Sequence, residues 1–446
     1  MNKNEKLSLA IQNYGCNAEG VAFCNDEIVF VPYSLVGEQL DATIIKANKK
    51  FNLAKIDNIR EKSPLRVTPP CPYFAKCGGC QLQHTQYQNS LEIKTQIVQK
   101  ALSGIGKLDA KVLACKPSEK QYHYRNKLAL PINPKTRKLG MYRTNSHNIV
   151  DIESCPLQTD NMTRLIRIFD RFLQLSTDTI FDDKTKKGLL KSLVARDVAN
   201  TMLVTVVING NDLPSKNILQ ELLEKNFENV GLSLNINKLC NNVILTENFK
   251  YIFGKESAKM NEFGIEYQIN NQSFLQVNDD VKNEIYSKIF DEVKDSVVID
   301  AYSGAGLLSA MIAKHAKKVF GIEIVAPATD LANKLAKQNK IENLKNINGD
   351  CATELPKLLT EFDDVDKQNL TIVLDPPRKG CAQNVLDSIL NVLPNKIVYL
   401  SCEPSTLARD LQILCIGGKY SIKSVQPYDM FPQTKHVETL VVLTKN

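Results

Sequence analysis

The chain has 446 residues, more than a single hydrophobic core usually serves, so we expect two or three domains. Its hydrophobic fraction of 43% is ordinary for a globular protein, and no apolar stretch reaches the roughly 20 residues that span a bilayer. MNKNEKLSLA has no signal-peptide core, so a cytoplasmic location is expected. The 56 Lys and Arg residues against 49 Asp and Glu residues give a formal charge of +7, which permits a polyanionic partner without requiring one.

The 12 cysteines are many for a protein of a reducing compartment, where disulfide bonds are rare. We therefore expect some of them to bind metal or to take part in chemistry. Seven are interpreted as packing residues, namely Cys16, Cys24, Cys115, Cys240, Cys351, Cys381 and Cys415.

Residues 7–59 alternate apolar and polar positions in short runs, with glycines as breaks. This pattern predicts a small all-β barrel of about five strands. Four lysines surround Phe51, which suits a nucleic acid held by cations and a stacking ring, although a solvated basic face is nearly as good an explanation. The predicted module, residues 1–62, resembles the TRAM domain, an RNA-binding barrel attached to several RNA-modifying enzymes.

A proline-rich linker leads to CPYFAKCGGC, which contains Cys71, Cys77 and Cys80, and ESCPL supplies a fourth thiol in Cys155. Four thiolates satisfy either zinc or an iron-sulfur cluster. Zinc sites usually use two close pairs of ligands, whereas here the first gap is wide and the last ligand stands alone. We therefore favour a [4Fe-4S] cluster with a structural or RNA-positioning role. The cysteine spacing of radical S-adenosylmethionine enzymes is absent.

Residues 63–262 are expected to form a central α+β domain around this cluster. Arg125 and Lys127 belong to a basic and aromatic group that suits phosphates or base edges, or they are ordinary surface charges. Apolar periodicity predicts helices over 88–102, 162–175 and 213–227, and strands over 128–132 and 202–208.

From residue 263 onward the chain repeats strand, glycine turn and helix. A strand over 296–300 is followed by a turn with Gly304 and Gly306 and by a helical run over 307–316. The next strand ends in Glu323, where a carboxylate can accept the ribose hydroxyls of an adenosine ligand. The turn lacks the full glycine fingerprint for a pyrophosphate, so a methyl donor is favoured over a dinucleotide.

Two further acids fit this arrangement. Asp350, in NGD, is expected near an adenine, and Asp375 opens DPPR after a strand over 371–374. The DPP motif also suits amino-group methylation, but that chemistry favours an aromatic residue where Arg378 stands. The sequence therefore predicts a Rossmann-like α/β domain over 263–446 with the layout of a class I S-adenosylmethionine-dependent methyltransferase.

The segment SCEPSTLARD places Cys402 at the end of a strand over 396–400, where ligands bind in open α/β sheets. A lone cysteine is more often a packing residue. Beside a methyl-donor site, however, a thiol has a chemical use, because C5 of uracil is a poor nucleophile and its methylation needs a thiol. Addition of a thiolate at C6 activates C5, and a base must then remove the C5 proton. Glu438, in a late strand over 435–443, is the predicted base and His436 is its rival.

These motifs closely resemble the RNA uracil-5-methyltransferase family, in particular bacterial ribosomal-RNA members that carry both a TRAM barrel and an iron-sulfur cluster. The resemblance covers nearly the whole chain. It rests on CPYFAKCGGC, ESCPL, SFLQVN, DAYSGAG, GIE, DPPRKG, SCEPSTLARD and HVETLVVL.

The resemblance implies a role for each matching residue. Cys402 would be the nucleophile and Glu438 the base, and Phe274 would stack on a flipped base, although a core aromatic is its plain alternative. Asp375 would lie near both the cofactor and the uracil. The remaining cofactor residues would be Gln276, Tyr302 and Glu323, and the cluster ligands Cys71, Cys77, Cys80 and Cys155.

Three positions depart from the family pattern, and none is a proposed catalytic group. Ser303 stands where relatives commonly have Cys, Leu307 where some have a polar residue, and Glu403 where Asn is more usual. The first two could alter the affinity for the cofactor, and the third the hydrogen bonding beside Cys402.

The predicted function is C5 methylation of uridine in RNA by a monomer without a membrane or an obligate protein partner. Ribosomal 23S RNA is favoured as substrate because barrel and cluster occur together. The alternatives are methylation of uridine 54 in transfer RNA and a non-catalytic RNA-binding or ribosome-assembly protein on the same scaffold. A third alternative is a redox enzyme that depends on the cluster, but the sequence has no flavin or nicotinamide signature to support it.

Overall fold

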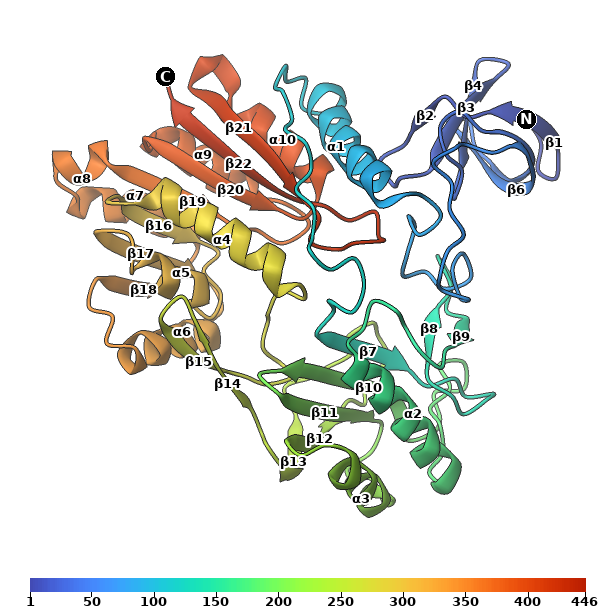
Figure 1. The fold of residues 1–446 in the computed structure, drawn as a ribbon. Helices are drawn as coiled ribbons and strands as arrows, with labels where there is room; N and C mark the ends of the chain where they lie inside the picture. Colours follow the sequence, from blue (N-terminus) through green and yellow to red (C-terminus); the bar gives the residue numbers. More distant parts are fainter.

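A computed structural model describes all 446 residues, arranged as three larger sheets with helices packed on two of them (Figure 1). No helix combines the length and the apolar character needed to cross a membrane.

The N-terminal region is all-β, as its alternating pattern predicts, with six strands rather than about five. Their order in the sheet is β1-β5-β6-β4-β3-β2. Leu40, Ala42 and Ile44 alternate along β5 and are fully buried, so one face of this strand forms the core of the region. The strands are β1 (Lys6–Ala10), β2 (Asn13–Tyr14), β3 (Gly20–Cys24), β4 (Glu27–Val31), β5 (Gln39–Ala47) and β6 (Asn52–Glu61).

The central sheet has five strands in the order β13-β12-β11-β10-β7. Two helices, α2 (Asp160–Leu175) and α3 (Lys216–Asn226), pack their apolar sides on it and share its core. The strands are β7 (Lys127–Pro131), β10 (Leu190–Val198), β11 (Thr201–Ile208), β12 (Val230–Ile236) and β13 (Phe249–Gly254). Two hairpins lie beside it, β8 (Gly140–Tyr142) with β9 (Ile149–Asp151), and β14 (Ala258–Glu262) with β15 (Ile265–Ile269).

The C-terminal sheet has seven strands in the order β18-β17-β16-β19-β20-β22-β21. The first five are parallel to one another, and β22 pairs antiparallel with both β20 and β21. The strands are β16 (Val297–Ala301), β17 (Lys318–Glu323), β18 (Leu344–Asn348), β19 (Leu370–Leu374), β20 (Lys396–Ser401), β21 (Tyr420–Tyr428) and β22 (Glu438–Lys445). Strand order reverses between β16 and β19, which marks the edge where ligands bind in such sheets.

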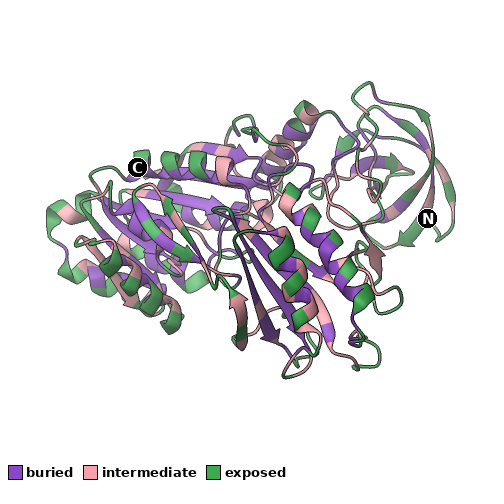
Figure 2. Cartoon of the chain, turned by 60° about the horizontal axis from the view of Figure 1, so that its bottom comes forward, coloured by how far each residue is buried: buried purple, intermediate pink, exposed green.

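Helices cover both faces of this sheet, so its central strands are buried while the outer helix surfaces stay exposed (Figure 2). One face carries α4 (Asp279–Val293), α5 (Leu307–Ile312) and α6 (Ala326–Gln338). The other carries α7 (Cys351–Glu361), α9 (Gln383–Val392) and α10 (Pro404–Leu414). Two short helices, α8 (Asp364–Gln368) and η1 (Ile416–Gly418), lie in connections.

Helix α1 (Tyr87–Gly104) belongs to the core of the C-terminal sheet, although it precedes the central sheet in the chain. Leu91, Val98 and Leu102 pack there beside α10 (Figure 1). The domain boundaries after residues 62 and 262 stay a prediction, and the range 63–262 thus contains a helix whose apolar side serves the C-terminal core.

Two predicted elements differ in length from the observed ones. The helix predicted over 307–316 ends at Ile312, and the strand predicted over 435–443 begins only at Glu438. In the second case, residues 435–437 belong to the connection between β21 and β22.

Candidate active site

The turn after β16 has the backbone that its glycines predict. Tyr302, Gly304 and Gly306 all adopt positive φ angles, of 78°, 55° and 76°. A Cβ atom on Gly306 would lie 2.5 Å from the Cβ of Ala332 in α6, whereas one on Gly304 would meet no atom within 4 Å. Gly306 therefore permits close helix packing, and the open space over Gly304 leaves room for a ligand.

Glu323, the last residue of β17, is held against this turn. The N–H of Gly304 donates to its Oε2 at 3.0 Å, and the N–H of Val325 donates to its Oε1 at 2.8 Å. The carboxylate is therefore fixed at the carboxyl edge of the sheet, where the sequence predicts a ribose acceptor.

The other proposed cofactor residues lie in different environments. Tyr302 is half-buried and its hydroxyl accepts the Ala382 N–H at 3.4 Å, while Gln276 is buried. Asp350 is exposed and caps α7 by accepting the Ala352 N–H at 2.9 Å. The cap uses one carboxylate oxygen, and the contact of Asp350 with an adenine stays a prediction.

Strand register brings Cys402 and Glu438 together. Ser401 in β20 pairs with Thr439 in β22, and the strands are antiparallel, so Cys402 and Glu438 are the next opposed positions. Burial raises the pKa of the Glu438 carboxyl to about 8, and the charge of Asp375 adds to the rise. Burial and then the charge of Glu438 raise the pKa of the Cys402 thiol to about 11.

A second pair of carboxyls lies at the same edge. Burial and the charge of Asp300 raise the pKa of Asp375, directly after β19, to about 7. Burial likewise raises the pKa of Asp300 to about 6, although its Oδ2 accepts a hydrogen bond from the Ser309 hydroxyl at 2.5 Å. Carboxyls with such raised pKa values are typical of functional sites.

Arg378 is the cation of this site, a role that the sequence alone did not indicate. Its charge lowers the pKa values of Cys402, Glu438 and His436. Arg378 therefore favours both the thiolate and the carboxylate, against the burial that opposes them. The signal in the sequence was its place in DPPR, next to a proposed substrate residue.

Buried Asp410 of α10 connects the loop that carries Arg378 to the helix that follows Cys402. Its Oδ2 accepts the Cys381 N–H at 2.8 Å and the Tyr399 hydroxyl at 2.6 Å. The Thr406 hydroxyl donates to the Arg378 carbonyl at 3.1 Å. Cys381, interpreted as a packing residue, is buried in this network, whereas the same interpretation is wrong for Cys16 and Cys240, which are exposed.

His436 is a weaker base than Glu438 in this environment. Burial and the charge of Arg378 lower its pKa to about 4, so the imidazole is neutral but has little affinity for a proton. A general base works best with a pKa near the operating pH, which favours Glu438.

Phe274 is 78% exposed, which excludes the alternative of a core aromatic. Residues in and next to the central sheet hold the segment around Phe274. An Arg196 nitrogen donates to the Ser273 carbonyl at 2.5 Å, and the Asn126 amide donates to the Gln276 carbonyl at 3.2 Å. An exposed ring on an anchored segment can stack on a base.

Arg125 lies at the edge of the central sheet, where its Nε donates to the Lys127 carbonyl at 3.3 Å. Burial, then Arg196 and Arg125, lower the pKa of Lys127 to about 8. Both arginines therefore repel the Lys127 ammonium group.

The four predicted metal-binding cysteines lie near one another. Burial raises the pKa of the Cys80 thiol to about 12, and repulsion from Cys155, Cys77 and Cys71 adds to the rise. No group of three His, Cys, Asp or Glu side chains is arranged tightly enough to hold a single metal ion. A [4Fe-4S] cluster would take all four of these thiolates as ligands. The cluster stays a prediction.

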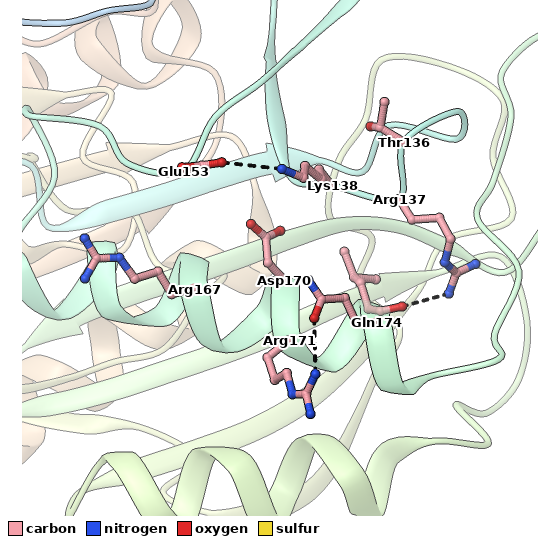
Figure 3. Close-up of a pocket in the computed structure, with 9 residues that line it drawn as sticks. Thr136, Arg137, Lys138, Glu153, Arg167, Asp170, Arg171 and Gln174 are labelled. Atoms are coloured by element: carbon pink, nitrogen blue, oxygen red, sulfur yellow. Dashed lines mark hydrogen bonds and ion pairs between the residues drawn. The ribbon is translucent and has the colours of Figure 1, made fainter.

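A separate hollow of about 680 Å³ lies on α2, lined by several cations (Figure 3). Arg137 donates to the carbonyls of Leu173, Ser176 and Asp178, and so caps the C-terminus of α2. Lys138 pairs with Glu153 at 3.4 Å. Arg137 and Lys138 therefore already serve the fold.

The strand order of the C-terminal sheet, the glycine turn after β16 and the acid at the end of β17 define a class I methyltransferase that uses S-adenosylmethionine. Residues 86–446 match the model of the tRNA (uracil-5-)-methyltransferase family. The chain therefore belongs to this family of RNA uracil-5-methyltransferases, and the family and enzyme class predicted from its motifs are confirmed.

Relatives of similar length support this assignment. An uncharacterized RNA methyltransferase of Clostridium tetani is 36% identical over 450 residues, which cover 99% of this chain and 97% of the relative. Another, of Halalkalibacterium halodurans, is 36% identical over 454 residues, 99% of this chain and 98% of the relative.

A solved structure extends the similarity to the whole fold. It is the tRNA (uracil-54, C5)-methyltransferase of Pyrococcus abyssi in complex with S-adenosyl-L-homocysteine. The two chains superpose with a TM-score of 0.78 at 25% identity, over 98% of this chain and 99% of the other.

Proposed function

We propose that this enzyme methylates C5 of uridine in 23S ribosomal RNA, with Cys402 as nucleophile and Glu438 as base. The observation that carries the proposal is the strand register, which opposes these two residues at the carboxyl edge of the sheet beside Asp375 and Arg378. Cys381 and Cys115 also lie near a buried carboxyl and a cation, but both are themselves buried, whereas Cys402 is partly exposed at the carboxyl edge of the sheet.

The chemistry begins with the Cys402 thiolate, which forms a bond to C6 of the uracil and makes C5 nucleophilic. Bound S-adenosylmethionine supplies the methyl group that C5 takes. Glu438 then accepts the proton from C5, the C5–C6 double bond forms again, and the thiolate leaves. Arg378 favours the thiolate at the start and at the end of this cycle.

Residues at the carboxyl edge would hold the methyl donor. Glu323 is oriented by two N–H groups to accept the ribose hydroxyls, and the open space over Gly304 admits the ligand. Gln276, Tyr302, Gly306 and Asp375 would complete the site, with Asp350 at its outer rim. Asp375 would also face the uracil.

RNA would be bound across all three sheets. Phe274 would stack on the flipped base, and Arg125 would meet a neighbouring phosphate. We propose residues 1–62 as a TRAM-like RNA-binding barrel, 63–262 as the central domain and 263–446 as the methyltransferase domain. Cys71, Cys77, Cys80 and Cys155 would hold a [4Fe-4S] cluster in the central part.

Release of tritium from RNA labelled at C5 of uridine tests the proposal. We expect release that depends on S-adenosylmethionine and that is lost in Cys402→Ala. Mapping of 5-methyluridine in a strain that lacks the gene identifies the substrate. Loss from 23S ribosomal RNA is expected, and loss from transfer RNA alone would contradict the proposed substrate.

A further inference from the structure

The connection between β21 and β22, residues 429–437, is here called the base loop, because Glu438 follows it directly. Hairpin connections usually lie on the surface. Most of this one is buried, including Asp429, Met430 and Gln433. A buried loop needs partners for its polar groups, and those partners come from the N-terminal half of the chain.

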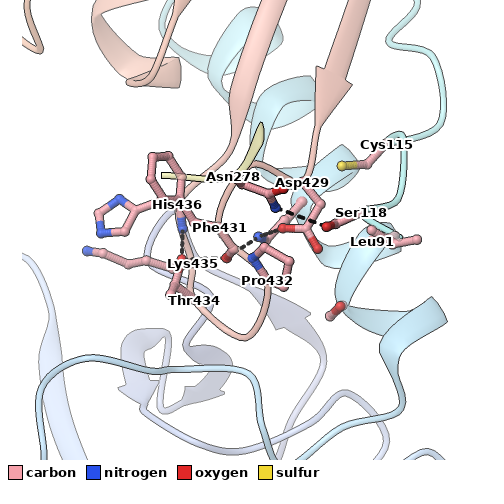
Figure 4. Close-up of polar contacts among 12 residues, drawn as sticks. Leu91, Cys115, Ser118, Asn278, Asp429, Phe431, Pro432, Thr434, Lys435 and His436 are labelled. Carbon is pink, nitrogen blue, oxygen red and sulfur yellow. Dashed lines mark hydrogen bonds and ion pairs between the residues drawn. The ribbon is translucent and has the colours of Figure 1, made fainter. Parts of the chain in front are cut away.

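Lys94 of α1 provides the first contact. Its ammonium group pairs with the carboxylate of Asp429 and donates to the carbonyl of Phe431 at 3.1 Å. Figure 4 shows Asp429, Phe431 and Pro432 in this loop. The side chains of Lys94 and Asp429 are both completely buried. A buried ion pair is costly to desolvate, so it is poor evidence for stability and often marks a place where one arrangement is specified.

Two further segments bind the tip of the loop. Tyr124 lies just before β7, and its hydroxyl donates to the Pro432 carbonyl at 3.1 Å. The N–H groups of Gln81 and Leu82 both donate to the Gln433 carbonyl, at 3.1 and 3.0 Å. The side chain of Gln81 accepts the Lys435 N–H at 3.1 Å.

The geometry points to a clamp. We propose that Lys94, Tyr124 and the Gln81–Leu82 backbone are positioning groups that fix the base loop, and with it the carboxyl of Glu438 relative to Cys402. This inference rests on the proposed role of Glu438. It also gives the segment after Cys80 a task in the reaction, since that segment contacts the connection from which the base emerges.

The clamp acts on one step. Addition of Cys402 to C6 and the transfer of the methyl group do not use Glu438, whereas removal of the C5 proton does. Loosening the base loop therefore slows proton removal, and the methylated RNA stays attached to Cys402. A misplacement of about 1 Å can cost a hundredfold in rate.

Tyr124→Phe removes one hydrogen bond to the base loop and leaves the ring in place. Its matched control is Tyr420→Phe, because the buried Tyr420 hydroxyl donates to the Pro394 carbonyl at 2.8 Å, at the other end of β21. The double variant Lys94→Met/Asp429→Leu removes both charges together, so that neither is left buried without a partner.

The experiment measures kcat, KM for RNA and the fraction of enzyme in a denaturation-resistant RNA adduct. For Tyr124→Phe we expect kcat to fall about five- to tenfold, KM to change less than twofold and the adduct to accumulate. The double variant should show a larger effect of the same kind. Tyr420→Phe should match the wild type in all three quantities.

Glu438→Gln, measured in parallel, separates this inference from the proposed function. Adduct accumulation in Glu438→Gln but in neither clamp variant would overturn the clamp alone. If adduct formation and turnover fell together in the clamp variants, a general structural role would replace the clamp. Absence of the adduct in Glu438→Gln would overturn both the base assignment and the clamp.

Discussion

At the scale of residues, the site depends on a few side chains whose charged forms are disfavoured by burial. Cys402, Asp375 and Glu438 all have raised pKa values, and Arg378 is the cation that acts on both Cys402 and Glu438. A buried carboxyl with a pKa of about 8 is neutral for much of the time at pH 7 and becomes a proton acceptor as pH rises. These properties give two predictions.

The rate of adduct release should increase with pH. Glu438 accepts a proton only when it is ionised, and the ionised fraction rises through its pKa of about 8. Single-turnover measurements between pH 6 and 9 should therefore show a rise of about tenfold or more in the release step. A release rate that does not change over this range would exclude Glu438 as the base.

Glu438→Gln should stabilise the fold at high pH. The folded pKa of about 8 exceeds the ordinary value of 4.5, so between these values the folded state binds more protons than the unfolded state and the free energy of unfolding falls as pH rises. The amide carries no charge and avoids this loss. Thermal unfolding should show the variant about 2 to 4 kcal/mol more stable near pH 9 and equal to the wild type near pH 4. Equal stability at both pH values would show that the carboxyl is not effectively buried.

At the scale of elements, the glycine turn after β16 and the antiparallel return of β22 build the site. The motif DAYSGAG made the turn predictable, because glycines at that spacing favour positive φ. The pairing of β20 with β22 could not be predicted from either strand alone, since apolar strands do not specify their partners. For the same reason, the periodicity of α1 identified a helix but not the core in which it packs.

Gly304→Ala should weaken the binding of S-adenosylmethionine specifically. Gly264, between β14 and β15, is a matched control, because both glycines have positive φ and an added Cβ on either would meet no atom within 4 Å. Each substitution should cost roughly 1 kcal/mol of stability through backbone strain. Calorimetry should give at least a tenfold higher Kd for Gly304→Ala and an unchanged Kd for Gly264→Ala. Equal Kd values would place the ligand away from this turn.

At the scale of the whole molecule, segments distant in the chain meet around the active site. The order of motifs predicted the family. The alternation of strands and helices predicted that ligands bind at the carboxyl edge of the sheet. Only the last three residues of the base loop, 435–437, were assigned to a longer strand, because HVETLVVL continues an apolar pattern. The contacts that bury residues 429–437 come from α1, Tyr124 and the cysteine segment. Such long-range contacts leave no local pattern in a sequence.

The cysteine segment should contain iron when the enzyme is made without oxygen. We expect about four iron atoms per chain and the visible absorbance of a [4Fe-4S] cluster. Cys155→Ser should lose both, whereas Cys240→Ser, which changes an exposed cysteine, should retain them. Tightly bound zinc in place of iron, or iron retained in Cys155→Ser, would contradict the proposed cluster.

The central claim is that Cys402 attacks the uracil and Glu438 releases the product. Its most direct test is mass spectrometry of Glu438→Gln after incubation with RNA and S-adenosylmethionine, followed by nuclease and protease digestion. We expect a 5-methyluridine adduct on the peptide that contains Cys402. An adduct on another residue, or RNA methylation at the wild-type rate by Cys402→Ala, would contradict it.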